Sequence, residues 1–159
     1  MKLAKSPLAG AAVVDVERFS DERGYFARVW MEEEAARQGY PGNWVVTSMS
    51  YNKLAGTLRG MHFQTAPHAE AKLVRCTRGA IFDVMLDLRP DSESYLKWHG
   101  EELSSENQRA LYIPEGFAHG FLTLSDDAEV FYHLSATYAP AAASGVRYDD
   151  PAFGICWPG

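Results

Sequence analysis

Cysteine is scarce in this chain of 159 residues, which contains only Cys76 and Cys156. The two lie far apart and form no C-x-x-C motif, which argues against a zinc or dithiol redox site. We therefore expect both thiols to be reduced and buried. No apolar run approaches the roughly 18 residues that a membrane-spanning helix needs, so we expect a soluble, cytoplasmic protein.

Positive charge is also in deficit. The chain has 15 Lys and Arg against 21 Asp and Glu, a formal net charge of -6. Such a field repels polyanions, so nucleic acid is not an expected partner, and a phosphorylated ligand would need a local basic pocket. The length and the ordinary share of hydrophobic residues predict a single domain over residues 1–159.

Short apolar or alternating runs, broken by Gly, Pro, Asn and Asp, make up most of the sequence. This pattern is typical of antiparallel strands, and the number of runs predicts an all-β jelly roll. Strands are expected over residues 8–14, 72–77, 80–88, 98–103, 110–113, 120–124 and 129–134. One short helix is expected over residues 31–37, which are rich in Glu and Ala and precede Gly39 and Pro41.

The strand expected over residues 80–88 has two different faces. Its even positions are apolar, whereas its odd positions are Ile81, Asp83, Met85 and Asp87. Because successive side chains point to opposite faces of a strand, we expect the even face to be core and the odd face to carry carboxylates.

A first cluster of reactive side chains spans residues 56–64, Gly-Thr-Leu-Arg-Gly-Met-His-Phe-Gln. Arg59 and His62 lie between or beside glycines, where a strand can bend and place polar groups in the mouth of a barrel. A lone strand histidine is more often structural. The neighbouring arginine favours function, because its fork of donors suits phosphate and is costly to bury unpaired.

A second cluster, residues 114–120, has the spacing P-x-G-x-x-H that ends at His119 and resembles the second cupin motif. It leaves open a metal-dependent alternative, whose ligands would be His62, His68, Glu70 and His119. The H-x-H pair of metal cupins is absent, because Phe63 and Gln64 follow His62, so this alternative is the less favoured one.

A third cluster contains Tyr132 and Tyr138, which share strand parity if the strand runs that far. Strand aromatics usually serve packing. A phenol can also deliver a proton, because its unperturbed pKa near 10 keeps it protonated at neutral pH.

These clusters belong to a longer series of ordered motifs, by which the sequence resembles the dTDP-4-dehydrorhamnose 3,5-epimerase family from about Val14 to Pro158. The motifs are FSDERGYF at 19–26, GTLRGMHFQ at 56–64, AKLVR at 71–75, FDV at 82–84, IPEGFAHGF at 113–121, DDP at 149–151 and ICWP at 155–158.

The resemblance implies a cupin-type jelly roll with one or two short helices, a homodimer that needs no metal or other cofactor. It also implies an isomerase that inverts carbon 3, carbon 5 or both in a nucleotide-linked 4-keto-6-deoxyhexose, in deoxysugar or cell-surface polysaccharide biosynthesis. The ketone acidifies the protons on both carbons, so a base of near-neutral pKa can remove one and leave an enolate.

The same resemblance assigns site residues. His62 matches the base, Tyr132 the acid that returns a proton from the opposite face, and Lys72 a residue near the sugar oxygens whose ammonium would stabilise the enolate. Substrate contacts are expected from Arg23, Phe26, Arg59, Gln64, His119 and Tyr138. The arginines are expected to bind the diphosphate, and Tyr138 to stack on the nucleotide base.

The sequence departs from the family in the partner of the catalytic histidine. In the family a carboxylate beyond the Trp-Pro element usually orients that imidazole, whereas this sequence ends at Gly159. Asp83 is the candidate for orienting His62 instead, because a carboxylate partner fixes which ring nitrogen is the acceptor. Asp83 could equally satisfy strand ends or Arg75.

A second departure lies in the residues that read the nucleotide base. Arg28 replaces a family Glu, Thr47 and Met49 replace a Gln and an Asn, and Ala143 replaces a later Glu. Losing these polar groups should relax or redirect base selection, so dTDP-, GDP-, UDP- and CDP-linked sugars all remain open. A non-catalytic cupin that binds a sugar nucleotide is the competing hypothesis.

Overall fold

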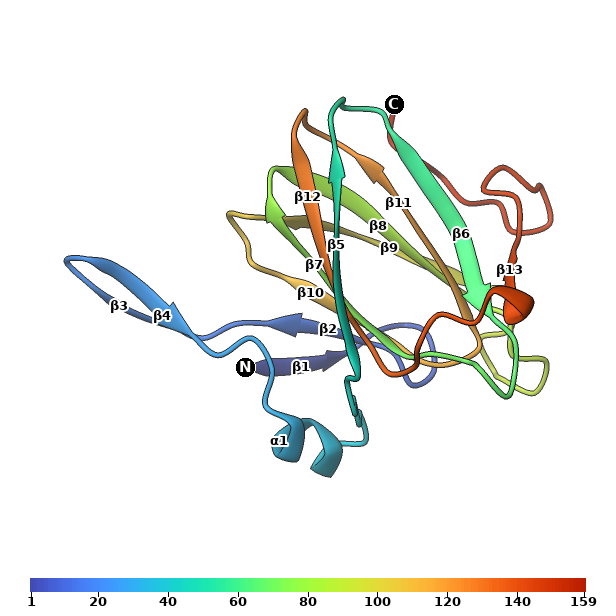
Figure 1. The fold of residues 1–159 in the computed structure, drawn as a ribbon, viewed down its shortest axis with the longest axis horizontal. Helices are drawn as coiled ribbons and strands as arrows, with labels where there is room; N and C mark the ends of the chain where they lie inside the picture. The colour runs from blue at the N-terminus through green and yellow to red at the C-terminus, as the bar shows by residue number, and fades with distance from the viewer.

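Two antiparallel sheets face each other in the computed structural model, which describes residues 1–159 (Figure 1). The strands are β1 (Lys2–Lys5), β2 (Ala12–Asp15), β3 (Arg18–Asp21), β4 (Gly24–Ala27), β5 (Val46–Asn52), β6 (Leu58–Gln64), β7 (Lys72–Arg78), β8 (Ala80–Asp87), β9 (Trp98–Ser104), β10 (Ala110–Ile113), β11 (Phe117–Thr123), β12 (Ala128–Leu134) and β13 (Ala143–Gly145). The only helices are α1 (Glu32–Arg37) and the single 3-10 turn η1 (Pro140–Ala142).

The larger sheet has the order β1-β2-β10-β7-β12-β5, and the smaller one β13-β6-β11-β8-β9. Strands distant in sequence are therefore neighbours, as the crossovers of a jelly roll require. The predicted all-β jelly roll is confirmed. No helix is long and apolar enough to cross a membrane.

The main core lies between the two sheets. Its fully buried side chains come from both, among them Val74 of β7 and Val130 of β12 on one side, and Ile81 and Met85 of β8 on the other. The alternation of side chains along each strand sends every second residue into this layer. Polar side chains in the same layer must therefore be bonded or line a cavity.

Most element boundaries agree with the sequence pattern, and the first strand is the main exception. A single strand over residues 8–14 was expected, but Gly10 adopts φ +81 and the chain turns there before β2. The turn is closed by the backbone N–H of Ser6, which donates to the carbonyl of Ala11. The preceding residues Lys2–Lys5 form β1 instead.

Strand β8 corrects the expectation that only its even face is core. Asp83 and Asp87 are fully buried, as are Val84 and Leu86 on the other face. The even face is covered by the C-terminal segment, through Val146, Phe153, Ile155 and Trp157. The strand therefore has two buried faces, and its carboxylates lie inside the sandwich, where they need partners.

The cysteines differ from each other. Cys76 of β7 is buried and free, as expected, whereas Cys156 is free but exposed. The expectation of two buried thiols is wrong for Cys156, because the segment after Gly154 covers β8 with Ile155 and Trp157 and turns the residue between them outward.

Candidate active site

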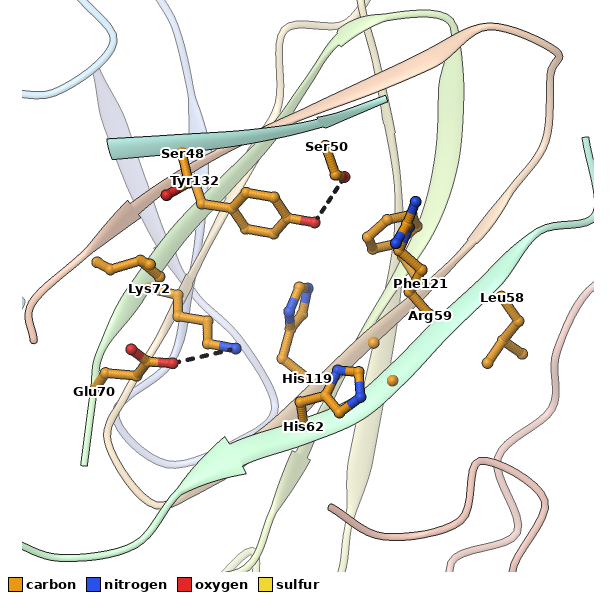
Figure 2. Close-up of a pocket in the computed structure, with 13 residues that line it drawn as sticks. Ser48, Ser50, Leu58, Arg59, His62, Glu70, Lys72, His119, Phe121 and Tyr132 are labelled. Carbon is orange, nitrogen blue, oxygen red and sulfur yellow. Dashed lines mark hydrogen bonds and ion pairs between the residues drawn. The ribbon is translucent and has the colours of Figure 1, made fainter. Parts of the chain in front are cut away.

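A cavity of about 640 Å³ opens between the facing sheets (Figure 2). Its walls come from β5, β7 and β12 of the larger sheet and from β6 and β11 of the smaller one. The lining residues are Ser48, Ser50, Leu58, Arg59, Gly60, His62, Glu70, Lys72, His119, Gly120, Phe121, Tyr132 and Leu134. The three candidate clusters thus meet in one space, although the first is distant in sequence from the other two.

A β-bulge in β6 brings Arg59 and His62 to the same cavity. Residues three apart on a regular strand point to opposite faces. Here His62 pairs with His119 and Arg59 pairs with Phe121, so two residues of β6 stand opposite one residue of β11. The extra residue reverses the facing of one side chain, as bulges do beside functional sites.

The bulge depends on two glycines that approach each other closely. Gly60 has φ +118, a region that side-chain-bearing residues rarely adopt, and a Cβ on it would lie 2.5 Å from the Cα of Gly120. A Cβ on Gly120 would in turn lie 2.7 Å from the carbonyl oxygen of Arg59. Only glycine fits at either position.

His62 and Tyr132 enter the cavity from opposite sheets (Figure 2). Burial lowers the pKa of His62, and the nearby charges of Lys72 and His119 lower it further. Burial raises the pKa of Tyr132 to about 12, although the Ser50 hydroxyl 3.1 Å from its oxygen favours ionisation. At neutral pH the site therefore holds a neutral imidazole facing a protonated phenol.

Lys72 is the buried cation of the cavity. Only 8% of the residue is exposed, and its Nζ lies 3.8 Å from Oε1 of Glu70. Burial lowers the pKa of Lys72, whereas the carboxylates of Glu70 and Asp83 raise it. An ammonium so placed can stabilise negative charge that develops on a ligand oxygen.

Asp83 does not orient His62, and this corrects the expected pairing. Its Oδ1 lies 2.7 Å from Nε2 of His119, the histidine next to His62 across β6 and β11. Oδ2 of Asp83 is buried without a partner. No side-chain hydrogen bond to His62 exists, and the His–carboxylate pair beside the cavity belongs to His119. The other such pair, His99 with Glu101, lies on β9 outside the cavity lining.

Comparisons with known proteins identify the family. The model of the dTDP-4-dehydrorhamnose 3,5-epimerase family matches residues 5–159. An enzyme of that name from Methanothermobacter thermautotrophicus is 45% identical over 157 residues, which are 99% of this chain and 84% of that protein. One from Sinorhizobium fredii is 44% identical over 151 residues, 95% of this chain and 77% of that protein.

This chain belongs to the dTDP-4-dehydrorhamnose 3,5-epimerase family. It is accordingly an isomerase of the cupin fold. A crystal structure of such an epimerase from Bacillus anthracis, with TDP and pyrophosphate bound, superposes with a TM-score of 0.95 at 38% identity and covers 99% of this chain and 90% of that one. A Legionella pneumophila epimerase in complex with dTDP-4-keto-L-rhamnose gives 0.92 at 32% identity, covering 99% and 83%.

Two expected contact residues of the epimerase lie beside the main cavity and not in it. Tyr138 and Gln64 line a smaller neighbouring cavity of about 290 Å³, which shares His62 and Glu70 with the first. Tyr138 lies beyond the end of β12 and is 73% exposed, so the strand parity expected for it does not apply. It is free to stack on a planar ligand.

The Gln64 side chain, expected to contact the substrate, is bonded to backbone groups instead. Its amide nitrogen donates to the carbonyls of His68 and Thr137, and its amide oxygen accepts from the N–H of Ala139. With every bond made to backbone, this side chain holds two loops together at the rim and has little left for substrate.

Arg23 and Phe26 lie far from the cavity of the same protomer. They belong to the hairpin of β3 and β4, which projects away from both sheets (Figure 1). Arg23 forms an exposed ion pair with Asp21, and Phe26 is 60% exposed beneath Arg28. The single chain therefore does not bring these two residues together with the rest of the expected site.

Sequence reasoning missed Ser48 and Ser50 as cavity residues and considered Glu70 only as a metal ligand. The alternation of Ser48 and Ser50 with Thr47 and Met49 was the available signal, because it puts both serines on one face of β5. The four residues of the metal alternative form no group of three or more that could hold an ion.

Proposed function

We propose that this epimerase removes the proton at carbon 3 or carbon 5 of a nucleotide-linked 4-keto-6-deoxyhexose with His62 and returns a proton with Tyr132. The observation that carries the proposal is the placing of these two side chains on facing sheets, around one cavity that also holds the buried Lys72. Membership of the family supplies the reaction, and relatives with TDP or a dTDP-sugar bound supply the class of ligand.

Each protonation state in the cavity fits its proposed step. The neutral imidazole of His62 accepts the carbon-bound proton, and the electron pair moves into the 4-keto oxygen to give an enolate. The ammonium of Lys72 stabilises that oxygen. The phenol of Tyr132 then gives its proton to the same carbon from the other side, which inverts the centre. Ser50 can donate to the phenolate that remains.

Solvent exchange tests the chemistry. The enzyme is incubated with 4-keto sugars in deuterated water, and deuterium at each ring carbon is measured by NMR. His62→Ala should abolish exchange, whereas Tyr132→Phe should permit exchange without inversion. Binding without any exchange in the wild type would favour a non-catalytic binding protein, and full inversion by Tyr132→Phe would assign the acid to another residue.

The nucleotide is decided by the same assay, run with dTDP-, GDP-, UDP- and CDP-linked sugars. Arg59 is proposed to bind the diphosphate. Its Nε donates to Asn52 at 2.7 Å, which holds the guanidinium at the cavity wall. The expected base-reading positions are dispersed: Thr47 hydrogen-bonds His133, and Met49 is exposed on the outer face of β5. A base preference would then come from Tyr138 and from a second protomer.

We propose further that the epimerase is a homodimer in which the hairpin of β3 and β4 reaches the partner's cavity. The hairpin forms no strand pairing with the rest of the chain and exposes Phe19, Tyr25 and Phe26. An isolated two-stranded hairpin with exposed aromatics is marginal in water, and such patches mark interfaces. In the proposed dimer, Arg23 and Phe26 would line the cavity of the second subunit.

We also propose that the enzyme is located in the cytoplasm. Cys156 carries an exposed, unpaired thiol, which an oxidising compartment would tend to convert to a disulfide. Cell fractionation with quantification of the free Cys156 thiol tests this, and recovery of the protein mainly outside the cytoplasm would refute it.

A further inference from the structure

Glu70 is the only carboxylate among the residues that line the main cavity. Its side chain is 12% exposed and lies where the main cavity meets the smaller one, since it lines both. A carboxylate there repels an anionic ligand and costs energy to bury, so its presence calls for a specific partner.

That partner is Lys72. Figure 2 shows the two side chains together at one side of the cavity, with Arg59 at the other. The distance of 3.8 Å between Oε1 and Nζ is that of an ion pair and exceeds a hydrogen-bond length. No hydrogen bond of Nζ is present, so Glu70 supplies charge while the three N–H donors of Lys72 stay free for a ligand.

The other groups around Lys72 contribute less than Glu70. Asp83 on β8 also raises the pKa of Lys72, but less than Glu70 does, and its Oδ1 is bonded to His119. Tyr132 on β12 is uncharged at neutral pH, because burial raises its pKa to about 12. Burial raises the pKa of Glu70 and lowers that of Lys72, and each charge of the pair opposes the shift of the other.

We propose that Glu70 is a positioning residue that keeps the buried Lys72 ammonium charged and unbonded in the empty site, ready for the enolate oxygen. The inference rests on the proposed function for the use of Lys72, but the ion pair itself can be measured without any turnover. Glu70 lies on the side of the cavity away from Arg59. At that distance its negative charge repels a diphosphate bound at Arg59 only weakly.

Competitive acylation of lysines with trace acetic anhydride, read by mass spectrometry across pH, tests the pair directly. Only the uncharged amine reacts, and the chain has just five lysines, so Lys53 and Lys97 serve as internal references. In Glu70→Gln the reactivity of Lys72 near neutral pH should rise about tenfold, as expected when one opposite charge at this range is lost. Glu33→Gln, an exposed change of the same charge on α1, is the matched control.

The outcomes separate the two proposals. Unchanged Lys72 reactivity in Glu70→Gln and in a second variant, Glu70→Ala, overturns the role of Glu70 whether or not the wild type exchanges deuterium. Raised reactivity with no wild-type exchange sustains the pair and defeats the proposed reaction. If both proposals hold, the alkaline limb of the pH profile of kcat should move to lower pH in Glu70→Gln and stay unchanged in Glu33→Gln.

Discussion

At the scale of single residues, the site lowers the pKa of His62 and raises that of Tyr132. Desolvation and the nearby charges of Lys72 and His119 lower the pKa of His62, which favours its neutral form. Tyr132 is partly buried beside a hydroxyl, and burial raises its pKa, so it stays protonated. A base and an acid are thus both present in usable form at one pH. The buried Lys72 adds the charge that a developing enolate needs.

The lowered pKa of His62 predicts the acidic limb of the pH profile. Because the neutral imidazole is the reactive form, activity should persist as pH falls through the ordinary histidine value of 6.5 and be lost only below it. Measuring kcat/KM from pH 4.5 to 8.5 checks this. An acidic limb above pH 6.5 would contradict the assignment of His62 as base.

Lys72→Met should lower kcat by about a hundredfold to a thousandfold, since the loss of a preorganised charge acts on the transition state. The same change removes one of the charges that depress the pKa of His62, so the acidic limb should move to higher pH. Steady-state kinetics of the variant checks both effects. An unchanged kcat with only a raised KM would show that Lys72 binds substrate without stabilising the enolate.

At the scale of elements, strand β6 determines the site through its bulge. Register with β11 changes between the His62 and Arg59 pairs, and the close approach of Gly60 and Gly120 makes room for it. Strand β8 contributes Asp83, whose carboxylate bonds the His119 side chain inside the sandwich. The C-terminal segment packs against the face of β8 opposite Asp83, so this strand is buried on both faces.

Gly60→Ala should destabilise the protein by about 1–3 kcal/mol through backbone strain alone, with further loss from the contact with Gly120. Gly39→Ala is the control, because Gly39 also has a positive φ but its added Cβ would meet nothing within 4 Å. Urea unfolding of both variants measures the difference. Equal losses would mean that the close approach in β6 adds nothing to the strain.

At the scale of the whole molecule, the projecting hairpin of β3 and β4 is the element on which the proposed dimer rests. It carries Arg23 and three exposed aromatic rings but contributes no residue to the main cavity of its own chain. The proposed dimer would cover these exposed rings with a partner subunit.

Mixing variants tests the exchange of hairpins. Arg23→Ala and His62→Ala should each be weakly active or inactive, but a dimer of one with the other has one cavity in which both residues are intact. Refolding the two together should therefore restore activity that neither shows alone. Sedimentation velocity should give twice the 17.7 kDa chain mass. A monomer, or no recovery on mixing, would contradict the shared site.

The sequence by itself determined the strand-rich architecture, the short helix and the motifs that carry His62, Lys72 and Tyr132, because periodicity and motif spacing are local properties. It misassigned the first strand, where Gly10 turns the chain, and it treated β8 as one-sided. The first error concerns a local turn, whereas the second concerns what covers a strand from elsewhere in the chain.

Only the tertiary structure decided which groups meet. Asp83 bonds His119 and not His62, and Gln64 holds two loops together, through contacts between segments that are distant in sequence. Glu70 and Lys72 are neighbours in sequence, but only the folded sandwich buries them in one cavity. The bulge in β6 likewise arises from register with β11, which no local pattern encodes. Residue types fix which chemistry is available, whereas distances of a few ångströms between separate strands decide which of it can occur.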